Sequence, residues 1–381
     1  MNFELSEDQI MLRDLVRDFA QKEIAPKIGT FEDKHVFPKE IICELAEIGV
    51  LGMTVPAELG GNRTDYLSFI LALEELARVS PSVCVIVSVH ASLFCGSVLK
   101  FGSDLQKQKY LPPAARGEIL GAFSLTEPGA GSDATSLKTK AVRSGDDYIL
   151  NGTKAWVTAG GEADALIIIA QTGAETGAPK LSAFIVEKGF PGFRVTKIEE
   201  KMGLHSSPTA MVTLEDCRVP VQNRLGDEGR GAAIALAGLD GSRIGVAAQA
   251  VGLSQQALEL AVGYAKQREA FGKKIAEFQA LQFMIADIAT LLEAGRLLTY
   301  RAADLHDRGR PFAKEAAMAK LFTSEAANKI AYLALQIHGG YGYSKEYAIE
   351  RIYRDSRVLS IYEGTSEIQR LVIARKLLKG A

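Results

Sequence analysis

The polar, glycine-rich loop Thr126–Ala134 is the first segment whose residue types could do chemistry. It contains Gly129-x-Gly131-x-x-Ala134, a relaxed form of the fingerprint that binds the pyrophosphate of a dinucleotide. That fingerprint needs a strand before it and a helix after it, whereas Pro128 precedes the first glycine and no amphipathic pattern follows Ala134. We therefore reject a Rossmann fold. Two interpretations remain: an ordinary surface loop, or a loop whose free amides and hydroxyls hold a cofactor.

Two segments toward the C-terminus carry further candidates. Three glycines in Gln336–Tyr343 break a helical pattern, which fits either a turn between helices or close approach of the backbone to a ligand. In Tyr362–Glu367, Glu363 precedes Gly364 and is either a solvated residue at a helix end or a catalytic carboxylate. Phe271–Lys274 lacks the upstream glycine and the Ser or Thr of a phosphate-binding loop.

The composition of the chain excludes several classes of protein. Its 381 residues suffice for two or three domains, and 44 basic against 46 acidic residues give no charge excess that would indicate a nucleic acid or membrane partner. Apolar runs such as Leu166–Ala170 are far shorter than the roughly 20 residues of a membrane span. The acidic segment Met1–Gln9 lacks the features of a signal or transit peptide. Scattered cysteines and histidines predict reduced, mostly buried thiols and no structural metal.

The N-terminal region has a helical pattern. Ser6 followed by Gln9 has the spacing of a capping box, and apolar residues then recur at helical intervals toward Pro26, where we expect this helix to end. Further helices are predicted over 38–49 and 66–80.

The middle of the chain has a β pattern instead. Apolar triplets flank Asn151-Gly152, which predicts a β-hairpin turned at these two residues. Short β-rich runs follow at 166–170, 183–186 and 211–214.

The C-terminal region is free to form long helices, because Pro311 is the only proline after Pro220. One apolar stripe steps by three and four residues through Phe278, Leu281, Ile285, Ile288 and Leu292. We predict an α+β multidomain fold with an N-terminal helical domain (1–122), a central β domain (123–230) and a C-terminal helical bundle (231–381).

The three candidate segments occur together, in this order, and give the chain a resemblance to the acyl-CoA dehydrogenase family over its whole length. Leu125–Asp133 resembles the first signature of that family, and Gln336–Asp355 resembles the second, with Gly339, Gly340, Gly342, Glu346, Arg351 and Asp355 in place. Arg351 and Asp355 stand at i, i+4, where a surface ion pair is expected. The resemblance implies the same three domains, the last one a four-helix bundle, and a homotetramer.

The resemblance also implies FAD held between the β domain and the bundle. One set of matching positions would line the flavin: Phe123, Leu125, Thr126, Ser132, Trp156 and Thr158. Another set, which a neighbouring subunit contributes in relatives, would hold the pyrophosphate and adenosine: Arg268, Phe271, Gln279, Gln336, Gly339 and Gly340. Thr365 and Glu367 match further cofactor contacts, and a core role for Trp156 in the β domain stays open.

Glu363 matches the catalytic base of the family, which takes the α-proton of an acyl-CoA while a hydride leaves the β-carbon for flavin N5. Some relatives carry the base elsewhere, at a position within 239–243, where this chain has Ser242 and no glutamate. The base is therefore assigned to Glu363. Positions that match substrate contacts are Ser132, Asp240, Arg243, Tyr362 and Gly364, and for Arg243 a structural ion pair stays open.

The substrate implied is a short- to medium-chain aliphatic acyl-CoA, about C4 to C8, because the tail 361–374 looks most like the short-chain branch of the family. The stretch 80–100 also lacks the arginine that a carboxylated acyl group would need. The implied electron acceptor is electron-transfer flavoprotein. Alternatives are a branched short-chain acyl-CoA dehydrogenase and, less favoured, an acyl-CoA oxidase or a non-catalytic binding paralogue. We expect a cytoplasmic protein, or a mitochondrial matrix protein if this is a processed chain.

Overall fold

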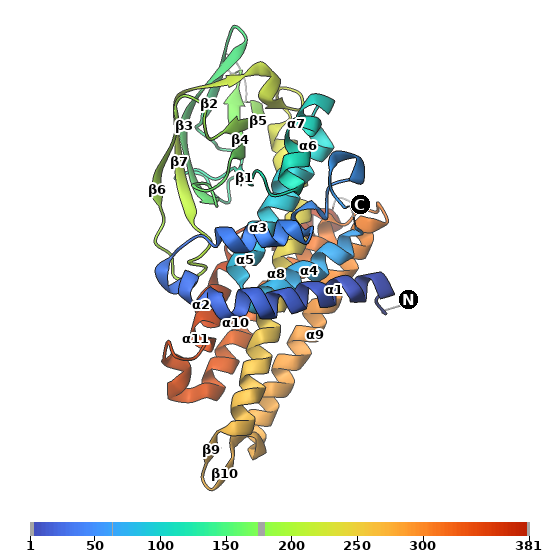
Figure 1. Cartoon of the computed structure of the whole chain (residues 1–381), viewed down its shortest axis with the longest axis vertical. Helices are drawn as coiled ribbons and strands as arrows, with labels where there is room; N and C mark the ends of the chain where they lie inside the picture. The colour runs from blue at the N-terminus through green and yellow to red at the C-terminus, as the bar shows by residue number, and fades with distance from the viewer. Residues whose placement is uncertain (1–3, 63, 174–179, 379–381) are drawn as a thin grey trace.

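The computed structural model describes residues 4–62, 64–173 and 180–378, and it has a helical region, a β domain and a second helical region in chain order (Figure 1). The first helices are α1 (Glu7–Phe19), α2 (Ala25–Lys34), α3 (Lys39–Glu47), α4 (Tyr66–Val79), α5 (Pro81–Ser88), α6 (Gly96–Phe101) and α7 (Asp104–Ala115). The main strands are β1 (Gly121–Ser124), β2 (Lys140–Ser144), β3 (Asp147–Thr158), β4 (Ala165–Thr172), β5 (Lys180–Glu187), β6 (Phe193–Ile198), β7 (Thr209–Pro220) and β8 (Arg224–Leu225). The last region contains α8 (Gly231–Gln267), the hairpin β9 (Glu269–Ala270) and β10 (Lys273–Lys274), α9 (Gln279–Asp307), α10 (Ala313–His338), α11 (Ile349–Ser356) and α12 (Ser366–Leu378). Residues 1–3 of the acidic N-terminal segment lie outside the described residues.

The first helix begins as predicted but does not end at Pro26. Ser6 and Gln9 form the reciprocal capping box. The helical path then continues through a π-helical turn, Ala20–Ile24, into α2, where Pro26 occupies the first turn. A proline is tolerated at that place because the π-helical turn just before it already interrupts the regular α-helical hydrogen-bond pattern.

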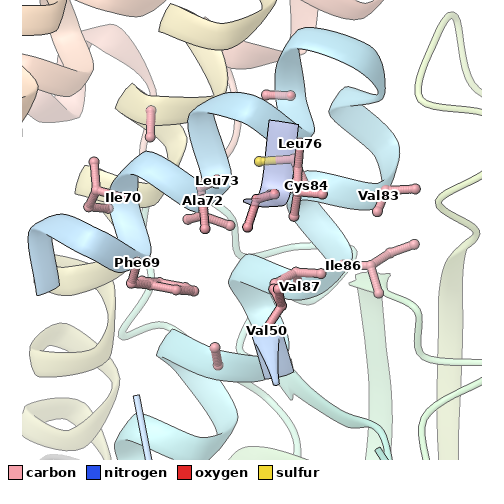
Figure 2. Packing of buried hydrophobic residues seen from close by; sticks show 14 of the residues in the cluster. Val50, Phe69, Ile70, Ala72, Leu73, Leu76, Val83, Cys84, Ile86 and Val87 are labelled. Atoms are coloured by element: carbon pink, nitrogen blue, oxygen red, sulfur yellow. The ribbon is translucent and has the colours of Figure 1, made fainter. Parts of the chain in front are cut away.

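The core of the N-terminal region forms where α4 and α5 meet. Phe69, Ile70 and Leu73 from α4 lie near Cys84 and Val87 from α5 (Figure 2), and all five are buried. The helical run Pro81–Phe101, π-helical over Val89–Cys95, has the length and hydropathy of a membrane span, but 83% of its 18-residue window is buried inside the protein, as in a core helix.

The β domain is an eight-stranded sheet with the order β6-β7-β3-β2-β4-β5-β8, and β1 pairs in parallel with β4. The hairpin predicted at Asn151-Gly152 is wrong, because β3 runs through both residues and the β2–β3 turn lies at 145–146. Gly152 sits instead at a bulge of the β3–β7 pairing, where a Cβ would lie 2.5 Å from Thr139 Oγ1. The glycine reflects a close approach of chain segments and not a turn. The three shorter predicted runs are confirmed as parts of β4, β5 and β7.

The C-terminal region confirms the long helices expected from the absence of proline. α8 spans 37 residues, and Pro311 lies in the connection between α9 and α10. Ile288 and Leu292 of the predicted stripe are buried in the bundle core, and Phe278, Leu281 and Ile285 pack against it. In Figure 1 the β9–β10 hairpin lies at the opposite end of the molecule from the β domain.

The ion pair expected between Arg351 and Asp355 is absent from the described residues. The i, i+4 pair on α11 is instead Glu350–Arg354, at 2.7 Å. Asp355 points into the protein, where it is buried and accepts a hydrogen bond from the Leu204 N–H at 2.7 Å, and burial raises the pKa of its carboxyl to about 7. Arg351 and Asp355 do lie on one helix, as the spacing predicts. The hydrogen-bond partner of Asp355 is decided instead by the packing of this helix against the segment that contains Leu204.

Candidate active site

Glu363 lies in a strained turn just before α12. Both Glu363 (φ 53°) and Gly364 (φ 89°) have left-handed backbone conformations, which is costly for a residue with a side chain. Gln369 of α12 donates its Nε2 group to the carbonyl oxygens of both residues, at 3.1 and 2.9 Å. Glycine is favoured at position 364 by its conformation, and a Cβ there would also lie 2.7 Å from that Nε2 atom and displace the Gln369 side chain. The turn is therefore fixed by its surroundings.

The Glu363 carboxylate is partly buried at the interface of three helices. Its Oε2 atom accepts a hydrogen bond from Ser242 Oγ of α8 at 2.6 Å. Burial raises the pKa of the Glu363 carboxyl, while the Ser242 hydrogen bond and the positive charges of Arg243 and Lys320 act in the opposite direction. A carboxylate with a raised pKa and a fixed orientation suits proton abstraction near neutral pH.

Asp240 and Arg243 flank Ser242 on α8 and form an ion pair, with 2.6 Å between Arg243 Nη1 and Asp240 Oδ1. Arg243 is buried, and its Nε atom has no hydrogen-bond partner in the described part of the chain. The ion-pair interpretation of Arg243 is therefore confirmed. A substrate contact stays compatible with it, because the unused Nε donor needs an acceptor.

Tyr362 joins the base to the β domain. It packs in the same apolar cluster as Phe123 of β1 and Leu125, and its hydroxyl donates a hydrogen bond to Gln249 Oε1 on α8. The β domain and the bundle thus meet directly beside Glu363.

The β-domain side of this junction fits a flat aromatic ligand. Trp156 on β3 is the only tryptophan of the chain. It is 59% exposed and has a positive φ of 59°, and both properties are unusual for a tryptophan in a sheet. Thr158, two residues on, is partly buried. The Ser124 Oγ atom at the end of β1 is buried without a partner in the described residues. An exposed indole and an unpaired buried hydroxyl are what a cofactor with a ring system and polar side groups would cover and satisfy.

The loop that follows β1 is anchored by a buried ion pair between Lys154 and Glu127. Lys154 of β3 is fully buried and donates its Nζ atom to the Leu125 carbonyl (3.0 Å) and to Glu127 Oε1 (2.8 Å). Glu127 also accepts the backbone N–H groups of Lys138 and Thr139. The pair therefore fixes both ends of the glycine-rich segment, which forms a loop as predicted, with Ser132 exposed on it. Thr126 lies between these anchors, and its carbonyl accepts the Ala155 N–H at 2.9 Å.

A second candidate region lies on the bundle near the β9–β10 hairpin. An open groove of about 730 Å³ is lined there by four of the residues expected to bind a cofactor, Arg268, Gln336, Gly339 and Gly340, together with nine others. A Cβ on either glycine would meet nothing within 4 Å, so the backbone is open to a ligand. The Arg268 guanidinium lies over the Tyr341 ring, 5.5 Å from its centroid.

The remaining predicted cofactor residues lie outside that groove. Phe271 is 95% exposed at the hairpin tip, and Gln279 is exposed at the start of α9. Thr365 precedes α12 and its Oγ1 accepts the Ile368 N–H at 3.3 Å, while Glu367 is exposed in the first turn.

The domains and the site together define a three-domain oxidoreductase subunit whose partly buried carboxylate lies at the junction of a β domain and a helical bundle. Models of the acyl-CoA dehydrogenase N-terminal, middle and C-terminal domains match residues 6–118, 122–217 and 229–378. The chain belongs to the acyl-CoA dehydrogenase family, whose members are FAD-dependent, and it is an enzyme of that class.

Three similar proteins illustrate the relationship. The mitochondrial short-chain specific acyl-CoA dehydrogenase of Rattus norvegicus is 49% identical over 376 residues, which are 99% of this chain and 91% of that one. The structure of butyryl-CoA dehydrogenase from Megasphaera elsdenii is 43% identical, with a TM-score of 0.97 over 99% of this chain and 100% of that one. A chain in a structure of the electron transferring flavoprotein of Acidaminococcus fermentans is 48% identical, with a TM-score of 0.98 over 100% of both chains.

Several residues of the site were not predicted from the sequence. In the sequence, Ser242 is notable only as a position without a glutamate, yet it bonds the Glu363 carboxylate. No motif points to Lys320 and Gln369, which hold the turn, or to Lys154, which holds the loop. The available signal for Lys320 is its position directly after Ala316-Ala317-Met318-Ala319, because a charged residue in an apolar stretch of a helix needs a reason.

Proposed function

We propose that this chain oxidises short- to medium-chain aliphatic acyl-CoA to the trans-2-enoyl-CoA, with Glu363 as the base that takes the α-proton. The observation that carries the proposal is the partly buried Glu363 carboxylate, held by Ser242 in a strained turn at the junction of the β domain and the bundle. The short-chain and butyryl-CoA specificities of the similar proteins support the chain length.

The residues of this junction divide the work of the reaction. FAD, when bound, supplies the acceptor at N5 for the hydride that leaves the β-carbon. Phe123, Leu125, Thr126, Ser132, Trp156 and Thr158 would hold the flavin end of that cofactor. Desolvation of the site prepares Glu363 to accept a proton, and its backbone N–H would polarise the thioester carbonyl as negative charge develops there. Asp240, Arg243, Ser132, Tyr362 and Gly364 would contact the substrate.

The two cofactor regions of one chain are far apart, which supports completion of each FAD site by a second copy. The groove at Arg268 lies next to the hairpin, and the β domain lies at the other end of the molecule (Figure 1). Arg268, Gln336, Gly339 and Gly340, with Phe271 and Gln279, would therefore hold the pyrophosphate and adenosine of a neighbour's FAD, while Thr365 and Glu367 add contacts. We propose that the protein assembles as a homotetramer. Each subunit has the domain limits 1–122, 123–230 and 231–381.

Electron-transfer flavoprotein is the proposed acceptor, in agreement with the similar chain found in a structure of such a protein. A branched short-chain substrate is the nearest alternative, and an acyl-CoA oxidase or a non-catalytic paralogue is less favoured. The location that we propose is the cytoplasm, or the mitochondrial matrix if this is a processed chain. Oxygen consumption during turnover distinguishes an oxidase, because a dehydrogenase needs the flavoprotein acceptor.

The direct test is anaerobic mixing of the purified yellow holoenzyme with butyryl-, hexanoyl- or octanoyl-CoA. We expect the flavin absorbance near 450 nm to bleach as the hydride arrives, with glutaryl-CoA ineffective because the pocket wall over 80–100 offers no arginine. Failure of every aliphatic acyl-CoA, branched ones included, to bleach the flavin contradicts the proposal.

Arg268→Ala is expected to weaken FAD binding. Its guanidinium can bridge two pyrophosphate oxygens, and losing such a charge-assisted contact costs about 1.5–3 kcal/mol, or roughly 10- to 100-fold in the dissociation constant. Fluorescence of released FAD on dilution measures the constant. Arg308→Ala, just after α9, where the arginine pairs with Asp304 at the surface, is the matched control and should bind FAD normally. An Arg268→Ala variant with wild-type FAD affinity refutes the pyrophosphate role.

A further inference from the structure

Lys320 is a fully buried lysine on α10, directly beneath the turn that carries Glu363. Its relative exposure is 0%, and Ala316, Ala317 and Ala319 beside it on the helix are buried as well. Its Nζ atom donates to the Gly364 carbonyl oxygen at 2.7 Å. The lysine therefore contacts the turn through the Gly364–Thr365 peptide group, one residue beyond the proposed catalytic glutamate.

Lys320 and Gln369 hold the left-handed turn from two sides. Gln369 Nε2 bonds the carbonyls of Glu363 and Gly364 from α12, and Lys320 Nζ bonds the Gly364 carbonyl from α10. Two consecutive left-handed residues persist only where the surroundings hold them, and these donors supply that restraint. The direction of the Glu363 side chain depends on the same backbone torsions.

The charge of Lys320 is not explained by an ion pair. It forms none within the part of the chain that the structure describes, and its one hydrogen-bond acceptor is a neutral carbonyl. A buried ammonium without an ion-pair partner is unfavourable, and burial lowers the pKa of Lys320 to about 8. A methionine of similar length would fill the space without that cost.

Two charged groups act on the Glu363 carboxylate, Arg243 on α8 and Lys320 on α10. Glu325 on α10 and Glu367 on α12 act on Lys320 instead. Arg243 is already paired with Asp240, and Glu325 and Glu367 are exposed. Lys320 is thus the unpaired buried cation that faces the base.

We infer that Lys320 is a positioning residue for the base: it fixes the Glu363–Gly364 turn through the Gly364 carbonyl, and its positive charge favours the ionised, proton-accepting form of Glu363. The inference rests on the proposed role of Glu363. The buried charge of Lys320 lowers the stability of the fold, and its role in positioning and ionising Glu363 gives a reason for its presence.

The test separates the charge of Lys320 from its hydrogen bond. Lys320→Gln keeps an N–H donor without the charge, Lys320→Met removes both, and Lys329→Met changes an exposed lysine on the same helix. The rate of anaerobic flavin bleaching by butyryl-CoA is measured with the holoenzymes from pH 5.5 to 9.5.

Both Lys320 variants are expected to raise the apparent pKa of the base by about one unit. Bleaching on the acidic limb of the pH profile should then slow, by up to about tenfold, and approach the wild-type rate at high pH, while Lys329→Met matches the wild type throughout. The glutamine variant should be the faster of the two at high pH, since it still holds the turn.

Thermal unfolding of the same holoenzymes is the second readout. A lysine whose pKa is lowered on folding costs stability below about pH 8, and that cost fades as the pH rises toward its unfolded value. Lys320→Met should therefore unfold at or above the wild-type temperature at pH 7, with the difference shrinking above pH 8. A lower unfolding temperature combined with an unshifted pH profile overturns the inference and leaves Lys320 a structural residue. Bleaching of Glu363→Gln at the wild-type rate, run in parallel, would instead refute the proposed role of Glu363 as the base.

Discussion

Replacing Glu363 with glutamine is expected to leave a yellow, folded protein that no acyl-CoA bleaches. Glutamine has nearly the same size and can still hydrogen-bond Ser242, so the turn and the FAD site keep their geometry. It cannot accept the α-proton, and removing a general base costs roughly 10²- to 10⁴-fold in rate. We expect this variant to lower the single-turnover rate of anaerobic flavin bleaching by butyryl-CoA by about a thousandfold or more.

The control for this prediction is Glu325→Gln on α10. That residue is an exposed glutamate in the electrostatic surroundings of Lys320, so the same chemical change is made without touching the base. It should bleach at the wild-type rate. Turnover retained by Glu363→Gln would move the base elsewhere, and Asp240 is the next carboxylate to test because burial raises the pKa of its carboxyl too.

Replacing Glu127 with alanine is expected to lower the stability of the holoenzyme by about 3–5 kcal/mol, the typical cost of removing one partner from a buried ion pair. The change leaves the fully buried Lys154 ammonium with only the Leu125 carbonyl, and it strips the N–H groups of Lys138 and Thr139 of their acceptor. Chemical or thermal unfolding followed by circular dichroism measures the loss. FAD affinity should fall as well, since Thr126 lies in the anchored segment.

Two further variants make this prediction specific. Glu118→Ala removes one partner of the exposed Arg116–Glu118 pair, which solvent screens, and should leave the unfolding free energy almost unchanged. The double variant Glu127→Leu with Lys154→Met removes both buried charges and should recover part of the loss. If Glu127→Ala is no more harmful than Glu118→Ala, the buried pair does not anchor the loop.

The sequence was a good guide to elements that depend on local rules. The Ser6–Gln9 box predicted the start of α1, and the missing prolines after Pro220 predicted the long helices α8, α9 and α10. Capping, proline exclusion and apolar periodicity act between residues a few positions apart, so they can be seen without the fold. The family signatures likewise brought Glu363 and the residues around it to attention.

Local rules failed where a distant segment decided the outcome. Asn151-Gly152 has the composition of a hairpin turn, but the glycine serves the close approach of Thr139 inside a continuous strand. Pro26 was expected to end a helix and instead fits the first turn of the next one. Asp355 was expected to pair along its own helix and instead accepts a hydrogen bond from Leu204, 151 residues away.

The sequence by itself determined the domains, the family and the identity of the candidate base, because composition, periodicity and ordered motifs are properties of the chain. The tertiary structure alone decided what surrounds that base: Ser242 on its carboxylate, and Lys320 and Gln369 on its turn. Ser242 lies 121 positions from Glu363 and Lys320 lies 44 positions from Gly364, so no short motif links them to the base. The pKa and orientation of a buried carboxylate depend on desolvation and on charges brought near by folding, and these exist only when the helices are packed.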